Sequence, residues 1–254
     1  MASLYLNESL DVIAFEVGRR VAMHGPDARH AAQVARVRTG ERIGIGDGRG
    51  RIGWGPVVQV AADAVAIDIE EVVVESPRRP ELWLVQALAK GDRDELAVQA
   101  ATELGVTGVV PWQAARSVSR WAGPKAAKGV ERWRTICREA AKQAIRPSVP
   151  TVGDLASTAD LATRAGQAGV LTLVLEPSAA TSLRDIVTAT AVDPERSPAR
   201  IELVVGPEGG IDPFELHTLE AVGARLTRLG PEILRTSTAG PAALAALATL
   251  LGSW

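Results

Sequence analysis

Three loops rich in glycine and proline carry the residues of this chain that could do chemistry. The first, at 175–178, contains Glu176; the second, at 206–210, reads Gly-Pro-Glu-Gly-Gly; the third, at 229–238, contains Arg235. Glycines let the backbone approach a ligand closely. An arginine among small hydroxyl residues can stabilise negative charge that develops on a bound molecule. The sequence therefore predicts a ligand site that these loops build, with Arg235 as its charged group.

The loop at 206–210 is neither of two common nucleotide-binding motifs. It lacks the Gly-Lys-Ser/Thr ending of a P-loop, and its glycines are spaced wrongly for a Gly-x-Gly-x-x-Gly fingerprint. By itself it is also compatible with a tight strand-to-helix turn that binds nothing. Arg235 argues against that alternative, because its charge is unfavourable there unless something packs against it. The 3 histidines and 1 cysteine show no metal-ligand spacing, so no metal is predicted.

Strands and helices must alternate from residue 81 onward to position these loops. Continuous apolar runs predict buried strands at 82–88, 109–112, 170–175 and 201–205, with a last short strand at 225–229. This alternation is typical of a mostly parallel sheet with helices on both faces. Ligands of such sheets bind at the carboxyl ends of the strands, which is where the three loops lie.

The predicted helices have recognisable ends and faces. Asp92 is expected to cap a helix, with Glu95 near a capping box and Gly105 at its end. Its buried stripe would be Leu96, Ala97, Ala100, Ala101 and Leu104. A helix at about 128–144 would bury Val130, Trp133, Ile136, Ala140 and Ala144. Opposite, it would present a cationic stripe formed by Arg134, Arg138 and Lys142. Asp212 is expected to cap a further helix with Pro213 first and Glu215 third, and the Ala-rich end at 239–251 is expected to be a buried helix.

The first 75 residues are predicted to be rich in β-structure. The run 43–46 leads into the Asp47-Gly48 pair, a strong hairpin signal, and short strands are expected at 57–60 and 65–69. One helix is expected at 30–37. Residues 76–80, Ser-Pro-Arg-Arg-Pro, break the pattern and are predicted to be a linker. The predicted domains are therefore 1–75 and 81–254.

Composition and charge indicate a soluble protein with a polyanionic partner. The net charge of the 254 residues is −2, but 18–51 holds 8 arginines against 3 acidic residues, and 116–146 holds 9 basic against 2 acidic residues. Either basic segment alone could be a solvated face, but two together favour nucleic acid. No apolar run reaches the roughly 18–20 residues that span a bilayer, and a single cysteine suits a reducing cytosol. A cytoplasmic protein without a membrane partner is expected, with Cys137 buried in a helix.

Two motifs together resemble those of the RsmE family of SPOUT methyltransferases. They are Gly206-Pro207-Glu208-Gly209-Gly210 and Leu229-Gly230-Pro231-Glu232-Ile233-Leu234-Arg235-Thr236. The resemblance continues in the family's order through 86–91, 103–106, 116–117, 139–143 and Arg146, and through His30, Val34, Arg36 and Gly40. This family methylates N3 of a uridine in the 16S ribosomal RNA of the small ribosomal subunit, with S-adenosylmethionine as the methyl donor. The resemblance therefore implies that reaction, cofactor and partner for this chain.

The resemblance also implies a fold and a cofactor site. The fold would be α/β, with a C-terminal SPOUT-type trefoil-knotted parallel-sheet methyltransferase domain and a small N-terminal PUA-like β-barrel that helps to bind RNA. The chain would act as a homodimer, with the S-adenosylmethionine pocket near the subunit interface. The residues that would hold the cofactor are Leu175, Glu176, Gly206, Pro207, Glu208, Gly209, Gly210, Leu229, Gly230, Ile233 and Leu234.

Arg235 is the predicted catalytic residue, because it could stabilise negative charge on the uracil carbonyl oxygens. The alternative is a phosphate or carboxylate contact without a catalytic role. No general base is identified; Glu208 lies in the motif but could equally order the loop. The residues predicted to bind RNA, mainly through phosphates, are Arg29, His30, Arg36, Arg38, Arg116, Arg120, Arg132, Arg138, Lys142 and Arg146.

Two departures from the family keep other functions open. Ser237 stands where the family usually has Glu, and Ala100 stands where it often has Lys. The first could alter catalysis without impairing cofactor binding. The alternatives are a non-catalytic RNA-binding or ribosome-assembly factor, a SPOUT methyltransferase with a different RNA target, and a Rossmann-like nucleotide enzyme acting on small molecules. The missing dinucleotide fingerprint and the segregated basic segments disfavour the last.

Overall fold

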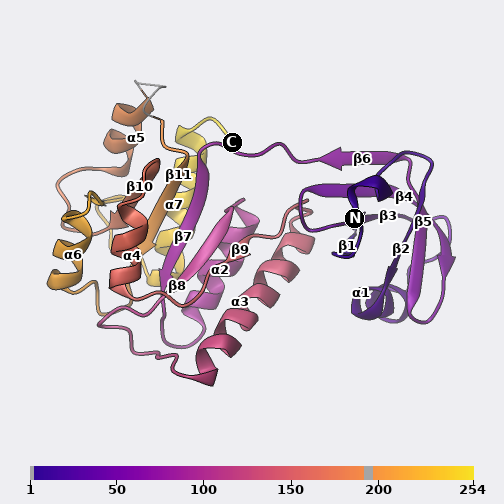
Figure 1. Cartoon of the computed structure of the whole chain (residues 1–254), viewed down its shortest axis with the longest axis horizontal. Coiled ribbons are helices and arrows are strands. Elements are labelled where there is room, and N and C mark those ends of the chain that lie inside the picture. Colours follow the sequence, from indigo (N-terminus) through magenta and orange to yellow (C-terminus); the bar gives the residue numbers. More distant parts are fainter. Residues whose placement is uncertain (1–2, 192–196) are drawn as a thin grey trace. The chain divides into compact units, whose positions relative to one another are not determined.

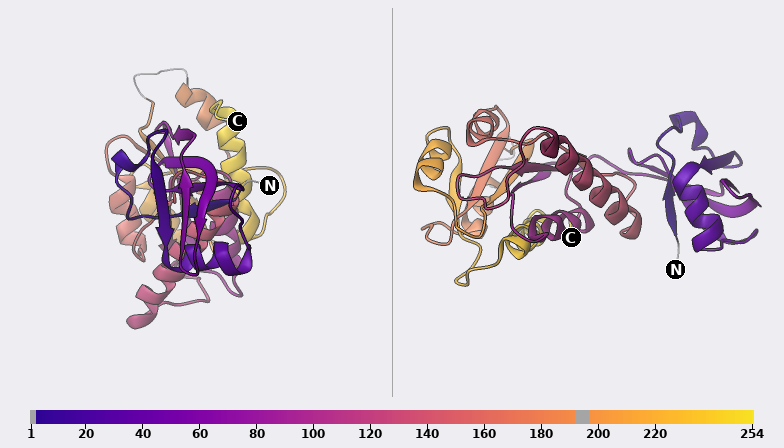
Figure 2. Two further views of the ribbon diagram at one scale, coloured as in Figure 1. Left: turned by 90° about the vertical axis from the view of Figure 1, so that its right-hand side faces the viewer. Right: turned by 90° about the horizontal axis from the view of Figure 1, so that it is seen from below.

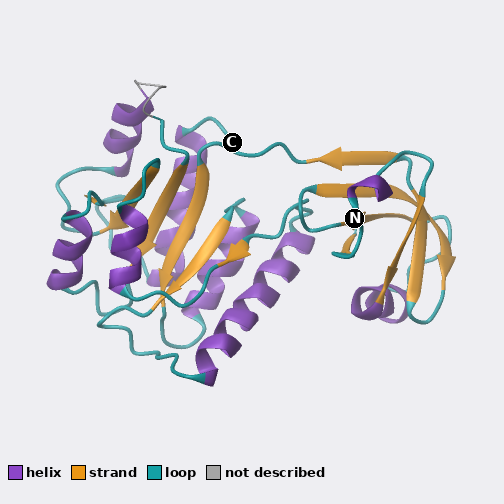
Figure 3. Cartoon of the chain, in the orientation of Figure 1, coloured by secondary structure: helices purple, strands orange, loops and turns teal. Residues whose placement is uncertain are grey.

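The computed structural model describes residues 3–191 and 197–254, which form two compact units. Unit 1 comprises Met1–Pro77 and Arg138–Val149, and unit 2 comprises Arg78–Cys137 and Pro150–Trp254. Figure 1 and Figure 2 show the units coloured along the chain, and Figure 3 shows them by secondary structure. No pattern along the chain indicates that Arg138–Val149 belongs with unit 1. The domain division at 76–80 remains a prediction.

Unit 1 is built on a six-stranded sheet in the order β1-β3-β4-β5-β2, with β6 paired to β4. The strands are β1 (Leu4–Leu6), β2 (Arg20–His24), β3 (Arg42–Gly46), β4 (Arg51–Val60), β5 (Ala64–Asp68) and β6 (Glu71–Val74). The strand pairs are antiparallel apart from β1 with β3. Three short helical segments complete the unit: η1 (Val12–Ala14), α1 (Gly25–Arg29) and η2 (His30–Val34). Met23, Ile45 and Ile67 are among the buried side chains of its core.

The Asp47-Gly48 hairpin predicted for unit 1 is confirmed, because β3 and β4 pair antiparallel on either side of it. The predicted strand 57–60 is only the end of the ten-residue β4. Gly55 interrupts the apolar pattern of β4 for a steric reason: a Cβ atom there would lie 1.8 Å from the carbonyl oxygen of Asp68. Strands β1, β2 and β6 were not predicted.

The helix predicted at 30–37 is wrong in its bounds. Helical structure begins at Gly25, with a proline in its first turn, and η2 ends at Val34. Proline is favoured in a first turn, where its missing N–H would have no partner in any case. Arg36 then adopts a φ of 54°, a left-handed conformation that cannot continue a helix.

Unit 2 contains a six-stranded parallel sheet in the order β12-β10-β11-β7-β8-β9, which confirms the predicted parallel sheet. Its strands are β7 (Glu81–Ala87), β8 (Gly108–Trp112), β9 (Thr151–Val152), β10 (Val170–Leu175), β11 (Arg200–Val205) and β12 (Arg225–Thr227). Its helices are α2 (Arg93–Glu103), α3 (Pro124–Gln143), α4 (Thr158–Ala165), α5 (Leu183–Ala191), α6 (Pro213–Glu220) and α7 (Thr236–Leu250). The last residues of α3, from Arg138 onward, belong to unit 1.

The helices of unit 2 cover the sheet in two layers (Figure 3). Helix α7 packs on α2, α5 and strands β7 and β11, whereas α4 packs on α6 and β10. Gly240 lets α7 approach the sheet closely, since a Cβ atom there would lie 2.9 Å from Leu84 Cδ1. Strands β7, β8 and β11 bury nearly every residue, as their continuous apolar runs predict.

Helix α2 departs from its predicted cap and buried stripe. Asp92 occupies the N-cap position in a left-handed conformation and makes no side-chain cap hydrogen bond, so the capping box is wrong. The Asp94 carboxylate instead accepts the backbone N–H groups of Ala89 and Glu95. Leu96 is 56% exposed, whereas Val98 is buried. Gly105 has a φ of 90° directly after the helix, which confirms the predicted stop.

The other predicted helices agree better with the structure. Helix α3 starts earlier than predicted, at Pro124, and buries Val130, Trp133, Cys137 and Ala140, while Ala144 lies beyond its end and is exposed. The Asp212 capping box of α6 is confirmed, with Pro213 in the first turn. The closing helix α7 begins slightly before its predicted bounds and buries one face.

Candidate active site

A pocket of about 410 Å³ lies where β10, β11 and β12 of unit 2 end. The three loops that the sequence singled out form its wall. The residues predicted to hold a cofactor line it, with the single exception of Gly209: Leu175, Glu176, Gly206, Pro207, Glu208, Gly210, Leu229, Gly230, Ile233 and Leu234. Arg235 lines it too. Loops far apart in the sequence therefore meet at the carboxyl edge of the sheet, where parallel sheets bind ligands.

Glycines shape the loop after β11. A Cβ atom at Gly206 would lie 2.6 Å from Ile211 Cγ1, so a side chain does not fit there. Gly210 has a φ of 72°, which glycine adopts readily. The carbonyl oxygen of Gly209 accepts a hydrogen bond from Arg116 Nη1 at 3.3 Å, and Gly209 is not part of the pocket wall. The capped start of α6 then fixes the end of the loop.

Three glutamates in the pocket wall differ in their hydrogen bonding. Glu208 accepts from Arg93 Nη1 at 2.8 Å and from the backbone N–H of Lys90 at 3.1 Å. Glu176 Oε1 accepts from the backbone N–H and the hydroxyl of Ser178. Glu232 also lines the pocket, and no hydrogen bond of its carboxylate is found in the described part of the chain. Glu232 is therefore the pocket carboxylate that remains available to a ligand.

The pKa of Glu208 reflects these contacts. Burial acts to raise it, but hydrogen bonds from its own backbone N–H, Arg93 and Lys90 outweigh burial and hold the pKa below its ordinary value. A carboxylate with a lowered pKa is a weak proton acceptor. Glu208 therefore ties the turn before α2 to the loop after β11, which agrees with the loop-ordering role left open for it.

Two pocket arginines that the sequence did not single out are engaged within the protein. Arg93 pairs with Glu208, and Arg228 Nη1 donates to the carbonyl oxygens of Ala179 and Ala180, which joins the loop after β10 to the end of β12. Arg228 directly precedes the third loop, whereas no motif marks Arg93. Both belong to the structure of the pocket wall.

Arg235 differs from these two arginines. It is the N-cap residue of α7, it is exposed, and it takes part in no ion pair within residues 3–191 and 197–254. The helix N-terminus behind it carries a partial positive charge and has no side-chain cap. Ser237, which replaces the family's usual Glu, is half-buried and is not part of the pocket wall. The guanidinium of Arg235 and the uncapped N-terminus of α7 therefore lie together at the pocket wall.

The predicted RNA-binding residues of unit 2 are exposed and have partners. Arg116 contacts Asp212 at 3.2 Å in addition to the carbonyl oxygen of Gly209, so it lies next to the loop that lines the pocket. Arg120 donates to the carbonyl oxygen of Ala115. Arg132 forms a bidentate pair with Glu95, at 2.8 Å for its shortest contact. Their role in binding RNA stays a prediction.

In unit 1, four predicted RNA-binding residues lie on the surface at or after the short helical segment: Arg29, His30, Arg36 and Arg38. Among the described residues none of these arginines forms an ion pair. The His30 ring lies against Tyr5 with a centroid distance of 6.4 Å. The guanidinium groups of this surface, here called the unit 1 arginines (Arg29, Arg36 and Arg38), are thus available to phosphates.

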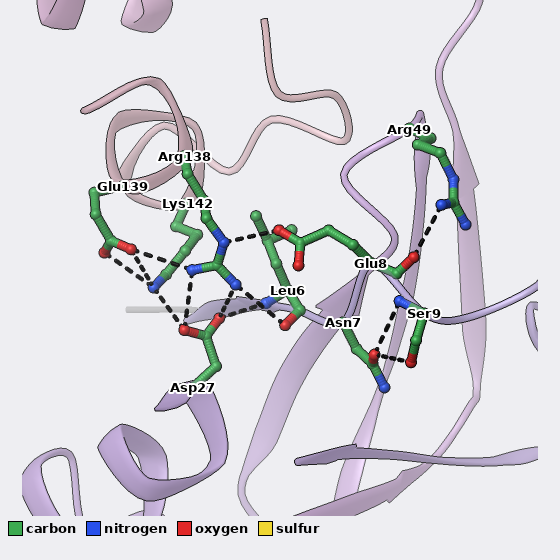
Figure 4. Close-up of polar contacts among 9 residues, drawn as sticks. All are labelled: Leu6, Asn7, Glu8, Ser9, Asp27, Arg49, Arg138, Glu139 and Lys142. Carbon is green, nitrogen blue, oxygen red and sulfur yellow. Dashed lines mark hydrogen bonds and ion pairs between the residues drawn. The ribbon is translucent and has the colours of Figure 1, made fainter. Parts of the chain in front are cut away.

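The cationic stripe predicted on α3 is wrong as a free surface (Figure 4). Arg138 pairs with Asp27 at 3.1 Å and with Glu8 at 2.8 Å, and Lys142 pairs with the same Asp27 at 3.2 Å. Glu139 completes this cluster, while Arg134 pairs with its neighbour Glu131. These charges are already neutralised within the protein, so the electrostatic reason for predicting RNA contacts at Arg138 and Lys142 is lost. Arg146 is half-buried.

Asp27 is the centre of this cluster. It is 5% exposed and also accepts the backbone N–H of Leu6. Burial acts to raise the pKa of Asp27, but the hydrogen bonds from Arg138 and Leu6 and the charge of Lys142 outweigh it and lower the pKa. The cluster is therefore a structural feature of unit 1.

The described residues contain neither a membrane-spanning helix nor a group of metal-ligating side chains. None of the helices is long and apolar enough to cross a membrane. The described histidine, cysteine and acidic side chains form no group of three that could hold a metal ion.

Two family profiles and several curated proteins are similar to this chain in sequence. A family profile described as an RNA methyltransferase domain matches residues 75–248, and one described as an RNA methyltransferase PUA domain matches residues 25–58. The ribosomal RNA small subunit methyltransferase E of Mycobacterium bovis is 40% identical over 242 residues, which cover 94% of this chain and 90% of the relative. The protein of the same name from Bacillus subtilis is 33% identical over 226 residues, 88% and 87% of the two chains.

A solved structure superposes on nearly the whole chain. The ribosomal RNA small subunit methyltransferase E of Neisseria gonorrhoeae, bound to S-adenosyl methionine, superposes with a TM-score of 0.82 at 26% identity and covers 98% of both chains. These matches confirm the predicted fold, a SPOUT-type α/β methyltransferase domain with a PUA-like N-terminal domain. The chain belongs to the ribosomal RNA small subunit methyltransferase E family.

Proposed function

We propose that this chain transfers a methyl group from S-adenosylmethionine to N3 of a uridine in the 16S ribosomal RNA of the small subunit. The observation that carries the proposal is the pocket at the ends of β10, β11 and β12, which gathers the residues of both family motifs. The Neisseria gonorrhoeae relative was solved with S-adenosyl methionine, and the relatives' names give small-subunit ribosomal RNA as the substrate. Both statements support the same ligand and substrate here.

The pocket residues fit this cofactor. Its volume of about 410 Å³ lies within the usual range for small-molecule sites. Leu175, Leu229, Ile233 and Leu234 offer apolar surface to a purine ring, and the loop containing Gly206 and Gly210 exposes backbone polar groups that can bind its edges. When bound, the cofactor supplies a methyl group on a positively charged sulfur.

We propose that Arg235 acts on the base that receives the methyl group. Uridine N3 carries a proton at neutral pH, so its removal leaves negative charge on the carbonyl oxygens of the ring. The exposed guanidinium of Arg235 and the uncapped N-terminus of α7 can stabilise that charge. The pocket wall holds the base near the methyl carbon, which is the main requirement for an in-line transfer.

Glu232 is our candidate for the group that accepts the N3 proton. Of the three pocket glutamates, Glu208 and Glu176 already accept hydrogen bonds within the protein. Glu232 lines the pocket three residues before Arg235, in the same loop. One loop would then supply both the proton acceptor and the positive charge.

The RNA backbone would contact both units. The unit 1 arginines and the exposed Arg116 and Arg120 of unit 2 would bind phosphates, which position the RNA without selecting its sequence. We further propose that the chain acts as a homodimer. This part of the proposal rests on the family resemblance of the two signature motifs.

The test is methyl transfer from labelled S-adenosylmethionine to small ribosomal subunits that lack the modification. Methylation at N3 blocks base pairing, so reverse transcription maps the product as a strong new stop. We expect one stop at one uridine, which should be absent when S-adenosylmethionine is omitted. Cofactor binding without transfer to subunits or free ribosomal RNA would indicate another RNA target. Absence of cofactor binding would overturn the proposal in favour of a non-catalytic RNA-binding or assembly factor.

A further inference from the structure

A chain of buried hydrogen bonds joins β7 to both signature loops. Gln86 Nε2 donates to Thr236 Oγ1 at 2.9 Å, and Thr236 Oγ1 donates to the carbonyl oxygen of Gly206 at 2.8 Å. Gln86 is 0% exposed and Thr236 is 6% exposed. Gly206 begins the loop after β11, and Thr236 directly follows Arg235. One side chain of the central sheet thus connects two loops that both line the pocket.

The direction of these bonds follows from the donors available. A carbonyl oxygen only accepts, so the single hydroxyl proton of Thr236 must go to Gly206. Thr236 can then only accept from Gln86, which requires the NH₂ group of the amide and not its oxygen to face Thr236. A second bond from Gln86 Nε2, to the carbonyl oxygen of Ala87 at 3.1 Å, fixes the same orientation.

Structural stability alone does not account for a glutamine at this position. Strand β7 is otherwise buried and apolar over Leu82–Val85, and an amide buried there is unfavourable unless all its polar atoms are bonded. The Oε1 atom of Gln86 is buried and has no hydrogen-bond partner in the described structure. Its NH₂ group, by contrast, donates to both Thr236 and Ala87, so the connection to the Arg235 loop is what this amide contributes at its position.

The hydroxyl of Thr236 also has an unusual use. Threonines commonly cap helix N-termini, and this chain has Thr-Ser-Thr at the start of α7. Here the N-cap position falls on Arg235 and no side chain caps the helix. The Thr236 hydroxyl instead holds Gly206. The uncapped N-terminus therefore stays directed at the pocket, and Arg235 is anchored by the residue that follows it.

We propose that Gln86 and Thr236 are positioning residues that hold the loop after β11 and the Arg235 loop in the geometry that binds the cofactor. The inference rests on the proposed function, since it assigns these residues to the S-adenosylmethionine pocket. Gln86 is not part of the pocket wall, and the hydroxyl of Thr236, which does line the pocket, is engaged with Gly206. Both residues therefore act through Gly206 and the backbone of the Arg235 loop.

Three substitutions test this by calorimetric titration with S-adenosylmethionine. Thr236→Val keeps the shape and removes the hydroxyl, and Gln86→Met removes the amide. Each should weaken cofactor binding about tenfold, the order expected for one buried hydrogen bond. Thr236→Ser keeps the hydroxyl and should recover most of the affinity that Thr236→Val loses. Thr172→Val is the matched control, because Thr172 is also buried in the sheet of unit 2 but its hydroxyl has no partner among the described residues.

The double variant Gln86→Met/Thr236→Val separates positioning from general destabilisation. Because the two residues form one connected chain, it should bind the cofactor about as weakly as the worse single variant. Melting temperatures identify any variant that fails to fold. If the wild-type chain binds S-adenosylmethionine and Thr236→Val binds it equally well, or if Thr172→Val weakens binding as much, the inference is wrong. If the wild-type chain itself does not bind, the proposed function fails instead.

Discussion

At the scale of residues, the pocket separates arginines that build it from one that faces its ligand. Arg93 is held by Glu208, and Arg228 is held by backbone carbonyl oxygens of the loop after β10. Arg235 has no such ion pair within the described residues and occupies the N-cap of α7. A cation without an internal partner can respond to charge that appears only during a reaction, which is where stabilisation increases the rate.

Arg235→Ala should lower the turnover number for methyl transfer by about 10²–10³-fold, the usual effect of removing one group that stabilises developing charge. The affinity for S-adenosylmethionine should change little, because the glycine loop and the apolar wall remain. Rates from single-turnover assays and affinities from calorimetry check the two parts separately. Arg134→Ala is a suitable control, since Arg134 is exposed and its one ion pair among the described residues is with Glu131. Equal turnover of Arg235→Ala and wild type would show that Arg235 has no catalytic role.

Glu232→Gln should lower methyl transfer about 100-fold or more while cofactor binding is retained, because the amide cannot take up the N3 proton. The same single-turnover assay measures the rate. Glu220→Gln provides the comparison, because Glu220 is exposed at the end of α6 and is not part of this pocket wall. Unchanged transfer by Glu232→Gln would leave proton removal to water, with Arg235 lowering the energy of the uracil anion.

At the scale of elements, continuous apolar runs in the sequence correctly predicted the central strands of the parallel sheet. Strands β7, β8, β10 and β11 were placed to within a few residues, because both of their faces are buried. Strands β1 and β6 were not predicted, since three or four residues are too short for a periodic pattern.

The sequence predicted more of the candidate site than of the fold of unit 1. Its success at the site is confined to residues within the three loops. Motif residues near Gly206 and Arg235 lie in the pocket wall as expected. Arg93 and Gln86 come from distant segments, and their partners cannot be read from spacing along the chain. The cationic stripe fails for the same reason: Asp27, which pairs with Arg138 and Lys142, is 111 and 115 residues away.

Asp27→Asn should destabilise unit 1, because it leaves Arg138 and the largely buried Lys142 without their shared carboxylate. Removing one partner of a fully buried pair costs roughly 3–5 kcal/mol. Arg138 remains partly exposed and keeps Glu8, so we expect about 2 kcal/mol. Urea unfolding monitored by circular dichroism measures the change. Asp63→Asn is the control, because Asp63 is exposed in the β4–β5 turn. A difference of less than about 0.5 kcal/mol would mean that the cluster is not a stabilising one.

The same substitution predicts a pH dependence. The pKa of Asp27 is lowered in the folded chain, where burial opposes the shift and the bonds from Arg138 and Leu6 outweigh it. Its contribution is therefore fully present above the unfolded value of about 3.9 and is lost as the pH falls through the folded pKa. The stability difference between wild type and Asp27→Asn should shrink as the pH falls below about 4. A difference that stayed constant from neutral to acidic pH would contradict the assigned shift.

At the scale of the whole molecule, the near-neutral total charge conceals a functional segregation. The basic segment 116–146 has nine cationic residues, but the structure divides them by partner. Arg132 pairs with Glu95, and Arg138 and Lys142 pair with Asp27. The unit 1 arginines have no ion-pair partner among the described residues. A count of charges along the sequence therefore overstates how many cations segment 116–146 can offer to RNA, compared with segment 18–51.

The salt dependence of RNA binding tests this difference. Arg36→Gln/Arg38→Gln should weaken binding to small-subunit ribosomal RNA and lower the slope of log affinity against log salt, by about 0.7–0.9 for each phosphate contact removed. Arg132→Gln should change the slope much less, because Glu95 already offsets that charge. Filter binding at several salt concentrations gives both slopes, and each variant changes arginine to glutamine in an exposed position. A larger slope change for Arg132→Gln than for the unit 1 double variant would place the RNA surface on α3 instead. Equal slopes for the wild type, Arg36→Gln/Arg38→Gln and Arg132→Gln would mean that neither surface contacts phosphate.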